Sequence, residues 1–244
     1  MTTSPGPFKF SRMVSWMVFL GVAATFVLGA CGGADEQDDR APEEVLASAK
    51  TTLDETSGVH IVLSTDKLPP GTSGILNADG IGTHAPAFEG TLKVATSGIT
   101  ADAEVVAVDD VVYAKLPFTT KFTPIDPGDY GAPDPAALMG TEGGLSSLLT
   151  AIEGVEEGQP ARAGELVLTV YTGTVSGDVV ASIIPTASAD SDFDATFTLT
   201  DEDVLNEAVL TGPFYPGGDD VTYTITFDEY DTSKNITAPN TTAP

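Results

Sequence analysis

Beyond residue 57, apolar side chains alternate with polar ones over many short segments. A two-residue period places the apolar side chains on one face of a strand and the polar ones on the other. The clearest segments are residues 193–200 and 221–227, where threonine fills most of the polar positions. Five further segments alternate in the same way, at residues 59–64, 91–95, 99–107, 112–116 and 166–170. Proline, glycine and aspartate clusters separate them, so the pattern predicts a large antiparallel sheet with one apolar face.

A change to helical spacing marks the segments that could cover this face. Residues 41–56 predict a helix, because Pro42 suits the first turn, two glutamates follow it, and four apolar side chains then share one face. Shorter helices are predicted at residues 135–139, 144–153 and 176–184. The fold class is therefore α+β, with one broad sheet and few helices.

A broad apolar sheet face and a few short helices can meet in two ways. They can close into a fully packed core, or they can leave an apolar gap between the sheet and the helices. The hydrophobic periodicity is the same in both cases, so the pattern leaves both arrangements open.

The charge of the chain excludes several classes of partner. There are 10 basic and 36 acidic residues, and the formal net charge is −26 at pH 7. Nucleic acid is excluded, because phosphate binding requires a basic surface. A bilayer rich in anionic lipid also repels such a domain, so attachment to a membrane needs another source than charge. One cysteine permits no internal disulfide and, with two histidines, leaves little for a metal site, so no cofactor is expected.

The first 31 residues are typical of a secretion signal that ends at a lipid attachment site. Lys9 and Arg12 precede an uncharged apolar stretch at residues 13–28, which is short for a membrane-spanning helix. The sequence LGAC at 28–31 then resembles the lipobox of bacterial lipoproteins. This resemblance implies that residues 1–30 are removed, and that acylated Cys31 anchors the exported protein to the outer face of the cell membrane. The alternatives are an uncleaved signal anchor and an ordinary signal with an incidental cysteine.

The rest of the chain divides into three parts. Residues 31–41 are polar and acidic, and we expect them to form a flexible tether behind the acylated cysteine. The strand and helix patterns place the folded domain at residues 42–231. Residues 232–244 show no such pattern, which predicts a loosely ordered tail.

Several short segments, taken in order, resemble one family of lipoproteins. They include SGVHIVL at residues 57–63, KLPPG at 67–71, DDVVYA at 109–114, GLSSLL at 144–149 and YTGTVS at 171–176. Across about residues 45–239 the chain is similar to the mycobacterial LppX/LprAFG lipoproteins, most closely to the LprG branch.

This resemblance implies a fold like that of the lipoprotein carrier LolA, in which a strongly curved antiparallel sheet forms a half-barrel. Helices cover its concave face, and an apolar cavity between sheet and helices holds acyl chains. LprG-like members bind acylated glycolipids such as phosphatidylinositol mannosides and lipoarabinomannan, and also triacylglycerol. They help to move lipid across the cell envelope beside a major-facilitator transporter. The resemblance therefore implies a monomeric, membrane-anchored lipid carrier of actinobacterial type.

A cavity of this kind would be lined by the apolar faces of the predicted strands and helices. The candidate lipid-binding residues on strands are Val59, Ile61, Leu63, Leu92, Val94, Val105, Val112, Phe197 and Ile225. Those on helices are Leu145, Leu148, Leu149, Ile152, Val180, Ile183 and Ile184. Each of these is alternatively an ordinary core residue. The chain is far more acidic than the mycobacterial pattern and differs from it at residues 118–133 and 213–220, so the sequence does not name the lipid.

No arrangement of residues predicts catalysis. The only cysteine is assigned to the anchor, and no serine lies in a G-x-S-x-G motif. The alternating aspartates at 190–194 resemble the start of a calcium loop, but Ala195 stands where glycine is needed. The expected function is lipid binding without an enzymatic step. The alternatives are a closed interaction, sensor or assembly module without lipid cargo, and an envelope glycosidase, which requires two buried carboxylates facing a cleft.

Overall fold

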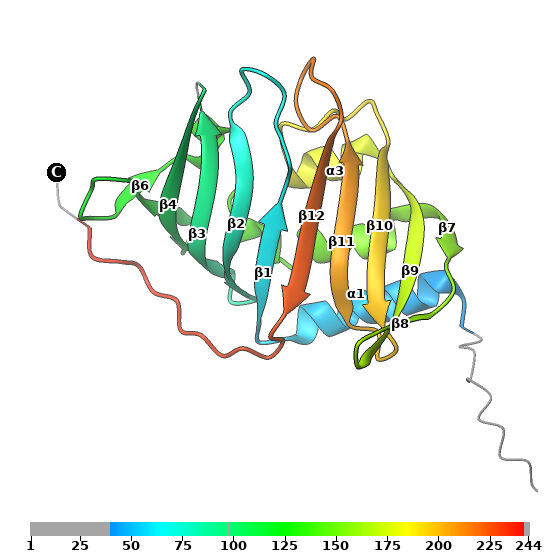
Figure 1. The fold of residues 1–244 in the computed structure, drawn as a ribbon. Coiled ribbons are helices and arrows are strands. Elements are labelled where there is room, and N and C mark those ends of the chain that lie inside the picture. Colours follow the sequence, from blue (N-terminus) through cyan, green and yellow to red (C-terminus); the bar gives the residue numbers. More distant parts are fainter. Residues whose placement is uncertain (1–39, 97, 242–244) are drawn as a thin grey trace, which may run out of the picture. The chain divides into compact units, whose positions relative to one another are not determined.

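The computed structural model describes residues 40–96 and 98–241, and their dominant feature is one antiparallel sheet of twelve strands (Figure 1). The strand order is β6-β5-β4-β3-β2-β1-β12-β11-β10-β9-β7, and β8 also pairs with β9. The strands are β1 (Gly58–Ser64), β2 (Gly74–Thr83), β3 (Ala87–Thr96), β4 (Ile99–Val108), β5 (Val111–Lys115), β6 (Thr123–Ile125), β7 (Ile152–Glu157), β8 (Ala161–Ala163), β9 (Leu166–Val175), β10 (Phe193–Thr200), β11 (Leu205–Gly212) and β12 (Val221–Asp228). The predicted α+β class with a curved, open antiparallel sheet is confirmed.

Helices are few, and they lie on the concave side of the sheet. Helix α1 (Pro42–Glu55) begins at the predicted proline, carries two glutamates in its first turn and buries all four predicted apolar side chains. The remaining elements are α2 (Leu148–Ala151), α3 (Gly177–Ile183) and the 3-10 turns η1 (Pro127–Tyr130), η2 (Ala137–Met139) and η3 (Leu145–Ser147). Two of the shorter predicted helices therefore correspond to η2 and α3.

The segment at residues 144–153 is not the single helix that its spacing predicts. It forms η3 and α2, and Ile152 then opens strand β7 by pairing with Val175 of β9. Pairing with β9 gives partners to backbone groups that would otherwise be exposed at that edge of the sheet. Gly154 has φ +61°, outside the helical region, so a helix cannot continue through it.

Strand β2 lies near the middle of the sheet although its sequence lacks clean alternation. Gly80 faces Gly90 of β3 across the ladder, and the ring of Phe88 packs against both backbones. A Cβ atom at Gly80 would lie 2.6 Å from that ring and 2.6 Å from the Glu89 carbonyl oxygen. The two glycines are therefore required for the close packing of Phe88. Its ring covers the backbone of β2 and β3 at the place where these glycines provide no side chains.

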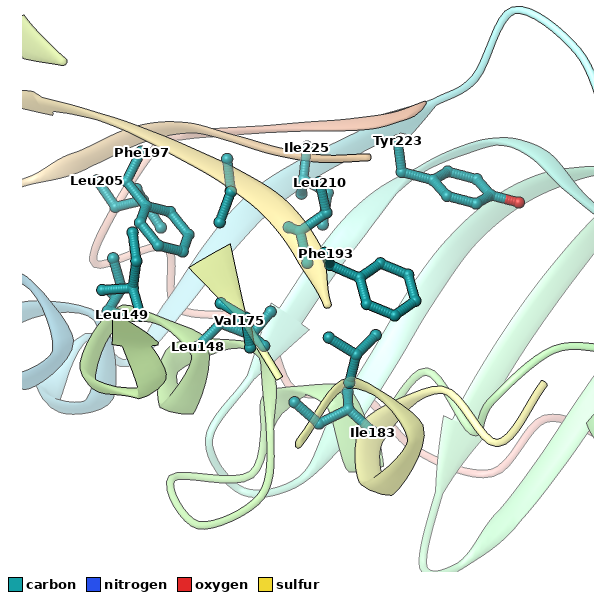
Figure 2. Close-up of a cluster of buried hydrophobic side chains, with 14 of the residues drawn as sticks. Leu148, Leu149, Val175, Ile183, Phe193, Phe197, Leu205, Leu210, Tyr223 and Ile225 are labelled. Atoms are coloured by element: carbon teal, nitrogen blue, oxygen red, sulfur yellow. The ribbon is translucent and has the colours of Figure 1, made fainter. Parts of the chain in front are cut away.

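The helices cover only one half of the concave face. Under β9–β12, α1, α2 and α3 close against the sheet in a core that contains Phe193, Phe197 and Phe214, each at most 1% exposed. Figure 2 shows this layer, with the apolar side chains of the strands pointing toward those of the two short helices. The rings of Phe193 and Phe214 meet edge to face, with centroids 4.9 Å apart. Under β2–β5 a smaller cluster contains Phe88 and Val105, and residues 116–136 cover it instead of a helix.

The C-terminal segment, red in Figure 1, runs along the sheet toward β6. Ile236 is buried against apolar side chains of β3 and β4 on the convex face. Lys234 pairs with Glu89 at 3.3 Å, and Thr241 forms a bridge with Phe122 just before β6. The described part of the predicted tail thus contacts the sheet at Ile236 and Lys234, because part of the convex face is apolar and requires a cover, while most of its other residues are exposed.

His60 links three strands on the polar face. Its Nδ1 lies 2.6 Å from a carboxylate oxygen of Asp228 on β12, and its Nε2 lies 3.1 Å from one of Asp79 on β2. The hydrogen bond to Asp79 is the largest influence on its pKa, and together with the bond to Asp228 and the charges of both carboxylates it raises that pKa above the ordinary 6.5. Partial burial opposes the rise but does not cancel it.

We expect His60 to stabilise the fold more at low pH than at high pH. Because its pKa is raised by folding, its contribution is complete below the unfolded value of 6.5 and is lost as the pH rises through the folded pKa. The difference in melting temperature between wild type and His60→Gln should therefore be larger at about pH 5.5 than at about pH 8.5. Lys93→Gln removes an exposed ion pair with Asp102 and leaves His60 in place, so its difference should stay nearly constant. A difference for His60→Gln that does not vary with pH contradicts this assignment.

Candidate functional site

An apolar cavity lies between the sheet and residues 116–148, and its larger part is in the half of the concave face that the helices leave uncovered. Its larger part has a volume of about 310 Å³ and lies against β2–β5. A smaller part of about 100 Å³ adjoins it and extends under β11 and β12. Both parts share Ile75, Leu92, Ala132, Pro133 and Pro135. The larger volume lies at the lower end of the range of ligand pockets, which is about 300–1,000 Å³.

The space exists because small side chains and prolines line it. Ala101 and Ala103 of β4 and Ala114 of β5 face the cavity, whereas β10 presents Phe193 and Phe197 on its buried face. The cover contributes four prolines to the wall, which are Pro117, Pro127, Pro133 and Pro135. Proline interrupts regular helix and strand, so the cover crosses the sheet as turns that do not fill the space beneath them.

The few polar atoms at the wall are largely paired with each other. The hydroxyls of Tyr215 and Tyr223 lie 2.6 Å apart, and Tyr223 donates to the carbonyl oxygen of Ile75 at 3.0 Å. Burial raises the pKa of both tyrosines, and for Tyr223 the neighbouring Tyr215 adds to the rise, so both are neutral. Among the described residues that line the two parts, none carries a charge. The wall therefore suits an uncharged, apolar ligand such as an acyl chain.

Nine of the sixteen candidate residues from the sequence line this cavity. They are Leu63, Leu92, Val94, Val105, Val112, Leu145, Leu148, Ile184 and Ile225. Leu92 is the most informative of them, because it lines both parts and lies where they meet.

The other seven candidates lie in the packed core and line neither part. They are Val59, Ile61, Leu149, Ile152, Val180, Ile183 and Phe197. In this structure they are core residues at the place where α1, α2 and α3 close against the sheet, and their contact with lipid stays a prediction. Alternation identifies the buried face of a strand, but it does not show whether a helix or a proline-rich loop covers that face.

Sequence reasoning also missed part of the wall. Ile75 belongs to β2, which has no clear alternation, and Tyr215 lies in the loop between β11 and β12, so neither gave a signal. Ala101 and Ala103 did give one, because small side chains on a predicted buried face leave room that larger ones would fill.

Within residues 40–96 and 98–241, no three side chains of histidine, cysteine, aspartate or glutamate gather in a way that could hold a metal ion. Over the same part of the chain, no helix is both long and apolar enough to cross a membrane. Cys31, the predicted signal and nearly all of the predicted tether lie outside the described residues.

Comparisons with known proteins agree with this architecture. The family model described as LppX_LprAFG lipoprotein matches residues 41–238. The chain is 25% identical over 197 residues to the lipoarabinomannan carrier protein LprG of Mycobacterium tuberculosis, which covers 78% of this chain and 80% of that protein. The crystal structure of LprF from Mycobacterium bovis superposes with a TM-score of 0.66 at 16% identity, covering 81% of this chain and 96% of that one. The crystal structure of LppX from Mycobacterium tuberculosis gives 0.60 at 16% identity, covering 82% and 100%. These two structures show a shared fold.

The substitutions Ala103→Val and Ala195→Val should have different effects, although both alanines are buried on strands. At Ala103 the added carbons enter the cavity and valine favours a strand, so the free energy of unfolding should stay the same or rise. At Ala195 they enter the packed core, where overpacking costs about 1–3 kcal/mol. Urea unfolding measures both. Equal losses of stability in the two variants would show that the β2–β5 half is as densely packed as the other.

Proposed function

Because the chain belongs to the LppX_LprAFG lipoprotein family, we propose that it is a membrane-anchored carrier that holds the acyl chains of a lipid or glycolipid in its two-part cavity and helps to move that lipid across the cell envelope. The observation that carries the proposal is the uncharged, apolar wall around Leu92. The name of the LprG relatives, lipoarabinomannan carrier protein, favours a glycolipid whose polar headgroup stays outside the cavity. No chemical change to the cargo is part of this proposal.

The energetics of such a carrier follow from the nature of the wall. Each methylene group gains about 0.8 kcal/mol on leaving water, whether it enters a bilayer or an apolar cavity. Transfer between the two is therefore close to neutral, and binding is reversible, as release by a carrier requires. A dozen methylenes exposed to water on the way would cost roughly 10 kcal/mol. A short, dry route between bilayer and cavity is thus the main kinetic requirement.

Entry of a chain requires the cover to move. Residues 116–136 contain the three-residue strand β6 and the 3-10 turn η1, and most of this segment has no ladder or helix hydrogen bonds. Segments of this kind open locally at lower free energy than strands and long helices. We assign the entry movement to this cover, while the packed half under β9–β12 stays closed.

The proposal includes the attachment of the domain to the membrane. Acylated Cys31 holds a monomeric domain at residues 42–231 on the outer face of the cell membrane, with residues 31–41 as an acidic tether. A major-facilitator transporter is the proposed partner for the onward movement of lipid.

Leu92→Trp should greatly reduce the amount of lipid that the protein retains. The indole ring would occupy the junction of the two cavity parts, where Leu92 lines both. We would express the domain from Gly32 onward, extract it with organic solvent and identify the extract by mass spectrometry. Wild type should yield near-stoichiometric acylated lipid, and the variant much less.

Leu166→Trp is the matched control, because Leu166 is a leucine of β9 that is 45% exposed and lies away from the cavity. It should retain lipid like wild type. Circular dichroism and urea unfolding would show whether both variants fold. Wild-type protein that yields no lipid, and takes none up from envelope extracts, would refute the carrier proposal and favour a closed interaction module.

Cys31→Ser should abolish lipid attachment and leave residues 1–30 on the protein. The hydroxyl group does not replace the thiol in lipid attachment, so neither acylation nor the following cleavage should take place. Metabolic labelling with palmitate measures the acylation and the intact mass of the protein measures the cleavage, with Ser57→Ala as a control. Wild-type protein that carries no palmitate and keeps residues 1–30 would identify these residues as an uncleaved anchor instead.

A further inference from the structure

Three apolar side chains at one end of the cavity are exposed to water, and we call them the lip. Ile99 at the start of β4 is 67% exposed, Leu116 after β5 is 39% exposed, and Phe118 has a relative exposure of 107%. A phenylalanine without any burial is unusual, because transferring its ring out of water is favourable by about 1.5–3 kcal/mol.

The backbone at Phe118 is also unfavourable for this residue. The amide of Thr119 donates to the carbonyl oxygen of Leu116 at 3.1 Å, which closes a turn with Pro117 and Phe118 at its centre. Such turns favour proline at the first central position and glycine at the second, where φ is positive. Phe118 occupies the second position with φ +67°, and a bulky residue in this region is an outlier. Strain of this kind, combined with complete exposure, points to a role outside folding.

The lip is continuous with the cavity. Leu116 and Pro117 line the larger part and are both exposed to water on their other side. On the neighbouring β3–β4 hairpin, Thr96 and Ala101 line the same part of the cavity, and Ile99 lies between them in sequence. An apolar surface therefore runs from the exposed ring of Phe118 into the space beneath the cover.

The segment that contains Leu116 and Phe118 lacks the acidic side chains that are common in the rest of the chain. Residues 111–125 contain no acidic side chain in a chain that has 36 of them, and they contain two lysines and three aromatic residues. Lys115 pairs with Glu104 at 2.7 Å, and Lys121 is exposed beside the turn. A bilayer surface prefers this combination, in which an aromatic ring enters the headgroup region and a lysine remains at the interface.

We propose that the lip docks on the surface of a lipid bilayer, with Phe118 inserted among the lipids and Leu116 and Ile99 at their boundary. Docking there would align the open end of the cavity with the bilayer interior, so that acyl chains enter without crossing water. The entry of acyl chains rests on the proposed carrier function, whereas binding of the lip to a bilayer can be measured without any cargo.

The substitution Phe118→Trp gives a direct test. The only tryptophan of the chain is Trp16, and a domain produced from Gly32 onward lacks it. Residues 40–96 and 98–241 belong to one compact unit, so this domain can be studied without the segment before it. In Phe118→Trp, emission should shift to shorter wavelength when vesicles of phosphatidylcholine with phosphatidylglycerol are added, and bromine-labelled acyl chains should quench it. Leu166→Trp is the control, and its emission should not change.

Phe118→Gly removes the ring and supplies the residue that the turn prefers. It should fold at least as stably as wild type and partition to the same vesicles about tenfold more weakly. Emission of the Phe118→Trp variant that does not respond to vesicles, together with unchanged partition of Phe118→Gly, would overturn the proposal. A concentration-dependent dimer that Phe118→Gly abolishes, without vesicle binding by wild type, would assign the lip to a second copy of the chain.

The lipid extract separates failure of docking from failure of the carrier function. Phe118 does not line the cavity, so Phe118→Gly should retain its extracted lipid. Loss of vesicle binding with cargo retained supports docking as a separate property of the lip. Vesicle binding by a protein that never holds cargo leaves docking in place and removes only the carrier function.

Discussion

The structure depends on a mismatch between a wide apolar sheet face and helices that are too few to cover it. Strands about 4.8 Å apart make a path of eleven strands roughly 50 Å wide, whereas a helix is only about 10 Å across. Helices α1, α2 and α3 pack under β9–β12, and residues 116–136 cover much of the remainder. A cover built from turns and prolines cannot interdigitate with a sheet at the density of a core. The cavity follows from this mismatch, and small residues such as Ala103 and Ala114 enlarge it.

Because of this mismatch, one half of the sheet supplies most of the stability of the fold and the other half supplies the cavity. The packed half contains the three phenylalanines at 193, 197 and 214 and most of the buried aromatic area, so it supplies the larger share of hydrophobic stabilisation. The cavity half leaves side chains such as Leu92 and Val94 without close partners on one side, which forgoes dispersion energy. A ligand that fills this space restores those contacts and stabilises the fold by mass action. The loose packing of the cavity half is therefore tolerated because the other half is closed.

The sequence predicted the strands and the first helix better than it predicted which residues line the cavity. Alternation located the buried faces of strands β10 and β12, and Pro42 located the start of α1, because these signals are local. It did not reveal β2, where Gly80 replaces a side chain to admit Phe88 from the next strand. Phe197 and Val105 have the same pattern on their own strands, yet one lies in the core and the other on the cavity wall. What distinguishes them is the segment packed above each, and that contact is long-range in sequence.

Weak docking is sufficient for a carrier that is already attached to its membrane. A tether near the proposed anchor at Cys31 keeps the domain at an effective concentration of about millimolar relative to the bilayer, so a single inserted ring contributes enough. The net charge of −26 opposes closer association with an anionic surface over a distance of about 10 Å. The acid-free residues 111–125 reduce that repulsion only where the cavity opens. Short-range attraction at the lip and repulsion elsewhere would orient the domain while leaving it free to dissociate, which release of a cargo requires.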